Sequence, residues 1–531
     1  MSGLLAGAGV LVAAAASAAA ILLPPGRQRS LAMLLALVLF PVLILGDQWH
    51  NHQIADLRHH AARLVVLLAI AAVAVGALTY VFHRWRTLLP LAIVFALPFR
   101  VPLHAGGETA NLLVPLYLVI AGGVVAALLR DWAIPRAGGD DREDSPGRES
   151  PRSETGPARR LPLVLAAVVV LYALQTLYSD DFSKGLQNVC FFLVPFTVAF
   201  ALLRDVKWDA RLLRLVLIVL GVEATLFVLI GSVEFVTRSL FWNDQVIRSN
   251  EFHTYFRVNS VFWDPNVYGR YLALVTVVAT AAMLWARTRE AFWLLCGLIL
   301  VLWVGLVPTF SQSSFLALLA GLAMLAAIRW SWRWTLGVVV VGAIGAVLVV
   351  LLVGGSGKIT SDRLNVDLSG RGNLVSGGLD LFSERPLQGY GSGSFQAAYR
   401  EHRKNKDVPV TVSHTEPVTV AAEQGLIGLV AYAALIVVAL WTLGSGLWAK
   451  APRAGGDDRE DSPGRESPRS ETGPARLAPP SLAARAAVLA TFVALLVHTL
   501  AYAGFFEDPI TWVLLALGTS LATAPAVRDP A

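Results

Sequence analysis

Long apolar runs, separated by short connections that carry most of the charges, constrain the fold of this chain more than any other feature. A helix needs about 20 apolar residues to cross a bilayer, and the 531-residue sequence offers fifteen stretches near that length. Only 15% of the residues are charged and the mean hydropathy is +0.61, whereas about a quarter of the residues of a soluble domain are charged. We therefore predict an all-α, polytopic membrane protein of about 14–15 transmembrane helices, near residues 3–23, 31–46, 63–82, 87–103, 111–130, 161–178, 186–203, 211–235, 268–287, 291–308, 313–329, 333–354, 418–444, 482–503 and 508–525.

Basic residues recur in every second connection between these runs. Lysine and arginine collect on the cytoplasmic side of membrane proteins, so the alternation assigns these connections, and the C-terminus, to the cytoplasm. The same rule accounts for the net charge of +6 and the pI near 9.4, and no nucleic-acid partner is expected. The basic connections carry Arg27 and Arg29, Arg84 and Arg86, Arg130 and Arg136, Lys207, Arg211 and Arg214, Arg287 and Arg289, Arg329 and Arg333, and Lys450 and Arg453.

Two cytoplasmic connections contain the same 25-residue text, PRAGGDDREDSPGRESPRSETGPAR, at 135–159 and 452–476. This text has no apolar face to bury, so it predicts disordered linkers. Its recurring Ser-Pro pairs would suit docking or phosphorylation, but we favour a duplicated insertion, which loops tolerate. The chain then divides into N-terminal membrane helices (1–134), a linker (135–160), central membrane helices (161–353), an outer loop (354–416), a membrane helix (417–451), a second linker (452–480) and C-terminal membrane helices (481–531).

Two long connections, residues 235–266 and 354–416, fall on the side opposite the basic connections. Loops of this length in a compact bundle are usually functional or disordered. Both mix aromatic residues, glycines and charges, which favours order. We expect the chemistry of the protein to lie in these two loops, on the extracytoplasmic side.

The first outer loop ends in EFHTYFRVNSVFWDPNVYGRYLAL. Arg257 lies about ten residues before the next apolar run, too far to belong to it. Asp264-Pro265-Asn266 is a helix-start signal. Arg270 would fall in the first turns of that helix, where an arginine can also extend to the lipid headgroups.

The second outer loop carries three features in order: SGRGN, with Arg371 between glycines; PLQGYGSGSF, a glycine-rich turn with Tyr390; and REHRKNK, a basic cluster. The cluster would suit a solvated or headgroup-binding patch at least as well as a site. His414 stands just before a helix that begins near Pro417. Glu423 falls in the second turn of that helix, and a carboxylate within an apolar span indicates function by default.

The succession RVNSVFWDPNVYGRYLAL, SGR, PLQGYGSGSF and HTEPVTVAAEQGLIG resembles the superfamily of O-antigen ligases and O-antigen polymerases, over about residues 250–520. The resemblance implies a GT-C type membrane fold without a metal or other cofactor. It implies an inverting glycosyltransferase of the bacterial inner membrane that moves a glycan from a polyprenyl diphosphate carrier to an acceptor sugar or glycolipid. Two departures are His414-Thr415, where the family often has His-Asn, and Gln312-Ser313, where it often has Ser-Arg.

The resemblance also implies roles for individual residues. His414 is the expected catalytic histidine, and Arg257 and Arg371 are expected to hold the carrier diphosphate. The remaining residues with an expected role in binding substrate are Arg270, Tyr390, Arg400, Arg403, Lys404 and Glu423.

Arginine and histidine suit transfer from a diphosphate carrier for chemical reasons that do not depend on the resemblance. A diphosphate leaving group needs fixed positive charge or a metal, and arginine offers a permanent charge and a fork of donors. A sugar hydroxyl that attacks needs a base that works near neutral pH, as histidine does. We expect no metal site, because the outer carboxylates are scattered among arginines.

Other interpretations stay open. A transporter or flippase of lipid-linked saccharides would bind the same carrier, but transporters place ionisable residues near mid-membrane; a non-catalytic scaffold would need neither His414 nor the arginines. We interpret His498, inside a late span, as an interhelical hydrogen-bonding residue. The histidines of the first outer connection have loose spacing that favours a solvated loop over a metal site: His50, His52, His59 and His60.

Overall fold

The computed structural model of the protein describes residues 3–49, 61–105, 108–133, 157–241, 243–252, 255–341, 361–403, 413–447 and 479–523. The labelled elements are α1 (Gly3–Leu22), α2 (Arg27–Asp47), α4 (Ala61–Arg84), α5 (Leu88–Ala96), β1 (Val101–Ala105), β2 (Glu108–Leu112), α6 (Val114–Ala133), α7 (Pro157–Thr176), α8 (Phe182–Asn188), η1 (Val189–Leu193), α9 (Val194–Leu203), α10 (Ala210–Thr237), α11 (Asp244–Phe252), α12 (Pro265–Leu284), α13 (Arg289–Leu306), η2 (Val307–Thr309), α14 (Gln312–Arg329), α16 (Ser361–Glu384), α17 (Phe395–His402), α18 (Glu416–Gly444), α19 (Pro479–Thr499) and α20 (Pro509–Thr523).

Twelve helices of the described residues are long and apolar enough to cross a membrane, which confirms a helical, polytopic membrane protein. The other three predicted spans are shorter where the structure describes them. Trp332–Val341 and α20 are apolar helices of 10–17 residues, and α5 has nine residues. The outer part of the predicted span 87–103 is not helical, because its last residues begin the antiparallel hairpin β1–β2, in which Val101 pairs with Leu112.

The helices pack as a bundle in which α12, α14 and α19 form one tightly contacting group and α1, α2, α7 and α9 another. Close approach depends on small residues, as is usual between membrane helices. On α14, a Cβ added at Gly321 would stand 3.2 Å from the Cβ of Ala494 and 3.3 Å from the carbonyl oxygen of Ala490, both on α19. An added methyl group would also meet Cγ2 of Val277 on α12 at 2.5 Å, so glycine gives α14 room against both neighbouring helices.

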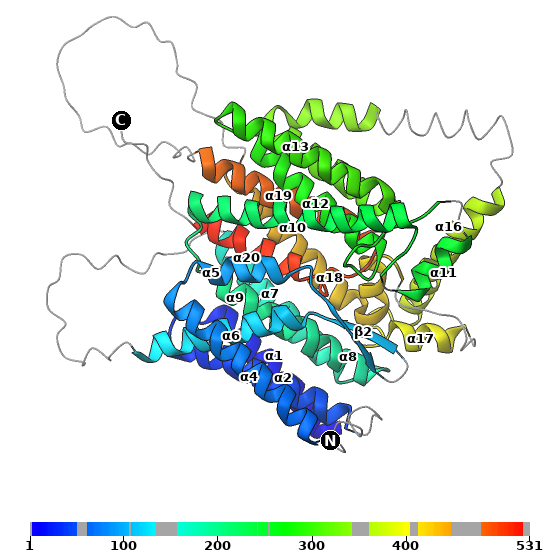
Figure 1. Ribbon diagram of the computed structural model, residues 1–531. Helices are drawn as coiled ribbons and strands as arrows, with labels where there is room; N and C mark the ends of the chain where they lie inside the picture. Colours follow the sequence, from blue (N-terminus) through cyan, green and yellow to red (C-terminus); the bar gives the residue numbers. More distant parts are fainter. Residues whose placement is uncertain are drawn as a thin grey trace, which may run out of the picture.

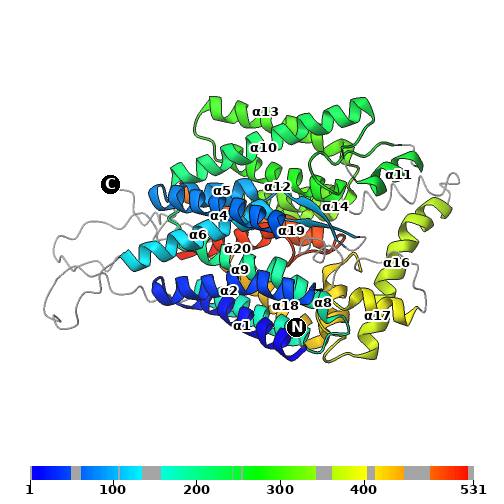
Figure 2. The same cartoon turned by 60° about the horizontal axis from the view of Figure 1, so that its bottom comes forward.

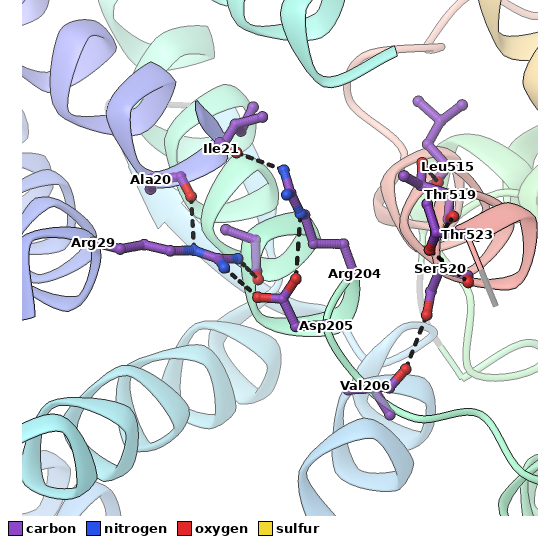
Figure 3. A network of polar contacts seen from close by, with 11 residues as sticks. Ala20, Ile21, Arg29, Arg204, Asp205, Val206, Leu515, Thr519, Ser520 and Thr523 are labelled. Carbon is purple, nitrogen blue, oxygen red and sulfur yellow. Dashed lines mark hydrogen bonds and ion pairs between the residues drawn. The ribbon is translucent and has the colours of Figure 1, made fainter. Parts of the chain in front are cut away.

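A polar network ties the N-terminal helices to the centre of the bundle at the end where the basic connections lie (Figure 3). The guanidinium of Arg29 is buried, forms an ion pair with Asp205, and donates to the carbonyl oxygen of Ala20 over 3.0 Å. Arg204 reaches Asp205 over 3.4 Å and the carbonyl oxygen of Ile21 over 2.6 Å. Arg29 and Arg204 thus satisfy carbonyls at the end of α1 that the helix itself leaves without partners.

The opposite end of the bundle carries the hairpin and the short helices (Figures 1 and 2). There α8, α11, α16 and α17 lie at the same end as β1–β2, so both long connections predicted to be outer loops lie at one end of the bundle. Both contain helices: α11 lies in the first, and α16 and α17 lie in the second. The order expected from their mixed composition is therefore present within the described residues.

Candidate active site

Arg257 precedes α12, and polar contacts to Thr309 and Asn266 fix its side chain beside the start of that helix. Asp264 caps that helix, accepting a hydrogen bond from the backbone N–H of Asn266 over 2.6 Å, as the helix-start signal predicts. The Arg257 side chain is half-buried and donates from Nε to the carbonyl oxygen of Thr309 over 2.9 Å and from Nη2 to Oδ1 of Asn266 over 3.0 Å. The arginine therefore has a defined orientation at the end of the bundle opposite the basic connections.

A carboxylate that the sequence analysis did not single out holds the chain around Arg257. Glu234, fully buried near the end of α10, accepts hydrogen bonds at Oε2 from the backbone N–H groups of Asn259 over 3.1 Å and Ser260 over 2.7 Å. Ser260 has a positive φ of 50°, a conformation that non-glycine residues seldom adopt. The only available signal was an acidic residue at the end of an apolar run.

Arg270 lies one helical turn beyond Asn266 and is buried. Its Nη2 atom is 2.9 Å from Oδ2 of Asp508, and the two side chains are 5% and 3% exposed. The alternative that Arg270 extends to the lipid headgroups is therefore wrong. Arg100, between α5 and β1, belongs to the same charge cluster: burial lowers the pKa of its guanidinium, Asp508 raises that pKa, and Arg270 lowers it.

Serines at the start of α14 continue the polar network. Ser311 bonds Ser314 over 2.7 Å and Ser313 over 3.2 Å. Ser313, which stands where the family often has arginine, lies 3.2 Å from Nε2 of His498 on α19. This contact confirms His498 as an interhelical hydrogen-bonding residue.

The glycine-rich turn of the second outer loop is clamped onto a break in α18. Gly425 has φ 63° and ψ −162°, so the helix is interrupted there. The break frees backbone groups that the turn then satisfies: the N–H of Tyr390 donates to the carbonyl oxygen of Ala422 over 3.1 Å, and the N–H of Leu426 donates to the carbonyl oxygen of Pro386 over 2.7 Å. A Cβ at Gly389 would lie 2.4 Å from the carbonyl oxygen of Glu423, so glycine is required at this contact.

The carboxylate of Glu423 holds the C-terminal end of this turn. It accepts hydrogen bonds from the backbone N–H groups of Gly393 over 2.8 Å and Phe395 over 3.2 Å. Phe395 is the first residue of α17, and negative charge at a helix N-terminus is favourable. The side chain thus positions α17, the helix that presents Arg400 and carries Arg403 at its end.

The basic cluster divides between described and undescribed residues. Arg400 is half-buried, and its Nε atom is buried without a hydrogen-bond acceptor among the described residues. Arg403 is exposed and lies over the ring of Tyr399, 5.7 Å from its centroid. Lys404 lies outside the described residues, as do His50, His52, His59 and His60, and the side chain of Arg371, within α16, is likewise not described.

Tyr390 sits in a small exposed network. Its hydroxyl donates to the carboxylate of Glu384, which His402 also contacts over 2.9 Å, and Arg385 lies 4.1 Å from the centroid of its ring. Burial and the bond to Glu384 raise the pKa of Tyr390 to about 12. The same hydrogen bond, and then His402, lower the pKa of Glu384. Sequence reasoning found Tyr390 but missed the three residues around it.

His414 is part of a strained turn directly before α18. Its backbone has a positive φ of 64°, and its side chain is half-buried. Ser413 stabilises the turn by bonding the carbonyl oxygen of Thr415 and the hydroxyl of Thr419, each over 2.7 Å. Strain of this kind is common at functional sites, where surrounding contacts hold it.

The loop between α19 and α20, residues 500–508, joins the two outer regions. Glu416, two residues after His414, accepts hydrogen bonds from the backbone N–H groups of Gly504 over 2.7 Å and Phe505 over 3.1 Å. The same loop carries Asp508, the partner of Arg270. One short segment thus ties the turn of His414 to α12, which begins beside Arg257.

A small cavity of about 80 Å³, lined by both apolar and polar side chains, lies beside this bridge. Its lining includes Lys184, Gln396 and Glu507 together with Glu416 and Glu423. Carboxylates, an amide and an ammonium provide both acceptors and donors for hydroxyl groups. Among the residues that the structure describes, no three His, Cys, Asp or Glu side chains form a group that could hold a metal ion.

The fold defines a multi-pass membrane protein. Residues 296–433 match the family model described as O-antigen ligase. The resemblance drawn from the motifs is thereby confirmed for this segment, which contains Arg371, the glycine-rich turn, His414 and Glu423 and begins after Arg257 and Arg270. A comparison with curated proteins finds no match to the chain.

Proposed function

We propose that this protein is a glycosyltransferase that moves a glycan from a polyprenyl diphosphate carrier to a sugar hydroxyl on the outer side of the bacterial inner membrane. The observation that carries the proposal is the bridge through residues 500–508. This one segment contacts the histidine turn of the O-antigen ligase segment through Glu416, and it pairs Asp508 with Arg270 of α12. A base and fixed cations at one end of a membrane bundle are what transfer from a lipid diphosphate requires.

Arg257 and Arg371 bind the diphosphate in this proposal. The guanidinium of Arg257 is oriented by Thr309 and Asn266, and such preorganised donors stabilise developing charge without a cost of reorganisation during the reaction. Arg270, neutralised by Asp508, contributes by holding the loop that leads back to the histidine turn. The leaving group then needs no metal ion, because the arginines neutralise the charge that forms on it.

His414 acts as the base. It takes the proton from the acceptor hydroxyl while the hydroxyl oxygen forms a bond to the anomeric carbon of the donor sugar. The bond between that carbon and the diphosphate oxygen breaks, and the polyprenyl diphosphate leaves with its electron pair. A single displacement of this kind inverts the anomeric configuration. The small cavity near Lys184, Gln396 and Glu507 offers hydrogen-bonding groups for the acceptor sugar.

The test is transfer by the purified protein from a polyprenyl diphosphate-linked glycan, in detergent and with EDTA. His414→Ala is expected to lower the rate by about 10²–10⁴-fold, the usual contribution of a general base, without loss of carrier binding. His83→Ala, an exposed histidine at the end of α4, is the control and should transfer at the wild-type rate.

Three results would contradict the proposal. Near-normal transfer by His414→Ala would exclude the histidine as the base. Activity lost in EDTA and restored by Mg²⁺ would exclude the metal-independent mechanism. Movement of the intact lipid-linked glycan across vesicles without any transfer would favour the transporter interpretation.

A further inference from the structure

A second, much larger cavity lies between helices of the bundle and is partly open. It measures about 1000 Å³ and is lined by α5, α10, α12, α13, α19 and α20. Its walls are almost wholly apolar, and its size is at the upper end of the roughly 300–1,000 Å³ usual for small-molecule sites. On α10, the lining side chains of Ile218, Val222 and Leu226 remain 52%, 55% and 52% exposed. Other helices therefore leave much of this apolar wall uncovered.

The lining of the cavity reaches both ends of the bundle: it includes Tyr271 and Ile510, near Arg270 and Asp508, and on three helices it extends to the opposite end. Its lining on α10 runs from Ala210 to Leu226, on α13 from Ala291 to Leu298, and on α19 from Ala483 to Thr491. Each of these stretches is the first part of its helix, at the end that the basic connections assign to the cytoplasm. On these three helices the lining thus reaches the cytoplasmic leaflet.

The cytoplasmic end of this cavity has the composition of a headgroup site. Arg214 and Arg287 both belong to the lining, on α10 and directly after α12, and both side chains are exposed. Trp208 and Trp285 line the same end, and tryptophan is enriched where membrane meets water. Two arginines from different helices, above an apolar cavity between those helices, match the basic interhelical pockets that bind anionic lipid headgroups.

We propose that this cavity binds an anionic diacyl phospholipid of the cytoplasmic leaflet. Arg214 and Arg287 pair with its phosphate, because guanidinium groups bind phosphate oxygens through two parallel hydrogen bonds. The acyl chains lie along α10 and α12. The carrier lipid of the proposed reaction is a different ligand, because its diphosphate belongs at the opposite end of the bundle, beside Arg257. The lipid site is independent of the transfer reaction.

The test measures lipid retention by the full-length protein, purified in mild detergent and reconstituted in nanodiscs with phosphatidylglycerol and phosphatidylcholine. Replacing both arginines (Arg214→Gln with Arg287→Gln) should lower retained phosphatidylglycerol by about tenfold or more, since each basic residue near a membrane surface contributes about fivefold. The matched control replaces Arg211 and Arg289, which are exposed at the starts of α10 and α13, each within three residues of a tested arginine, but lie outside the lining. That control should retain phosphatidylglycerol nearly as well as the wild type.

A second variant tests the apolar part. Ala282→Trp fills the cavity from α12 and should lower phosphatidylglycerol retention with both arginines intact; a melting temperature near that of the wild type shows that the variant is folded. Equal retention by the two arginine pairs would overturn the proposal, as would equal retention of phosphatidylcholine and phosphatidylglycerol. Recovery of polyprenyl diphosphate as the lipid lost on filling the cavity would also overturn it.

Discussion

The two outer regions of the proposed site are built in different ways. Around α12 the structure fixes side chains: Arg257 is oriented by Thr309 and Asn266, and Arg270 is paired with Asp508. Around α17 and α18 it fixes the backbone instead: hydrogen bonds hold the glycine-rich turn against the break in α18. The first region can orient a charged ligand group without moving, whereas the second depends on conformations that only glycine allows.

This difference predicts different responses to substitution. In the α12 region, a change that keeps the charge but alters the geometry should damage binding and leave the fold intact. In the α17–α18 region, a change of a single hydrogen to a methyl group should damage the fold, because the clamp leaves no space. The predictions below test this contrast, from the largest expected effect to the smallest.

Gly389→Ala should have the largest effect on both stability and transfer. Gly389 has φ +66°, and the added Cβ would meet backbone atoms of α18 at 2.4–2.6 Å, so the turn must detach from the break at Gly425. The expected destabilisation exceeds about 1 kcal/mol, measured as a lower melting temperature together with lost transfer. Gly297→Ala is the control, because nothing lies within 4 Å of its added Cβ. Equal melting temperatures for the two variants would contradict the clamp.

Arg257→Lys should reduce transfer while leaving the melting temperature nearly unchanged. Lysine keeps the charge but cannot hold Thr309, Asn266 and a phosphate in one planar arrangement. Hydrogen bonds to charged groups contribute about 1.5–3 kcal/mol, so transfer should fall about 10- to 100-fold. Arg248→Lys, at an exposed arginine on α11 in the same loop, should keep full activity. A wild-type rate for Arg257→Lys would show that bidentate geometry is not used.

Glu423→Gln should have an intermediate effect. Its amide oxygen can still accept one backbone hydrogen bond, from Gly393 or Phe395, but one buried N–H loses its partner, at a cost of about 1–3 kcal/mol. We expect a lower melting temperature and a smaller loss of transfer than in His414→Ala. Glu423→Ala, which removes both acceptors, should be less stable than Glu423→Gln. The reverse order would show that the carboxylate does not hold the turn.

Glu384→Gln should have the smallest effect, and one that depends on pH. Because Tyr390 and His402 lower the pKa of Glu384 in the folded state, its ionised form stabilises the protein above the ordinary carboxyl pKa of about 4.3. That contribution is lost as the pH falls through the lowered pKa. The melting temperature of Glu384→Gln should lie slightly below that of the wild type at pH 7 and converge with it toward pH 3.

The control for this measurement is Glu401→Gln, at an exposed glutamate of α17. Its melting temperature should follow that of the wild type at every pH. A pH-independent difference between Glu384→Gln and the wild type would mean that the network around Tyr390 acts through packing and not through charge. In that case Tyr390 would be held by its ring contact with Arg385.

The sequence by itself determined the membrane class, most of the helices and the positions of the motifs. Apolar runs near 20 residues long form helices in a bilayer, because every backbone N–H and C=O group must find its hydrogen bond within the segment. The helix starts at Asp264 and near Pro417 were also predictable, because capping residues and proline mark helix starts locally. Where a span was shorter or gave way to a hairpin, as after α5, composition alone could not show it.

Only the tertiary structure decided which motifs meet and what holds them. Glu234, Glu416 and Asp508 lie far along the chain from the groups they contact, and no local pattern encodes such pairings. The break at Gly425 was hidden too, because glycine in an apolar run is common and its positive φ follows from the turn that packs against it. Local sequence determines which backbone conformations have low free energy, but long-range hydrogen bonds and packing select among them.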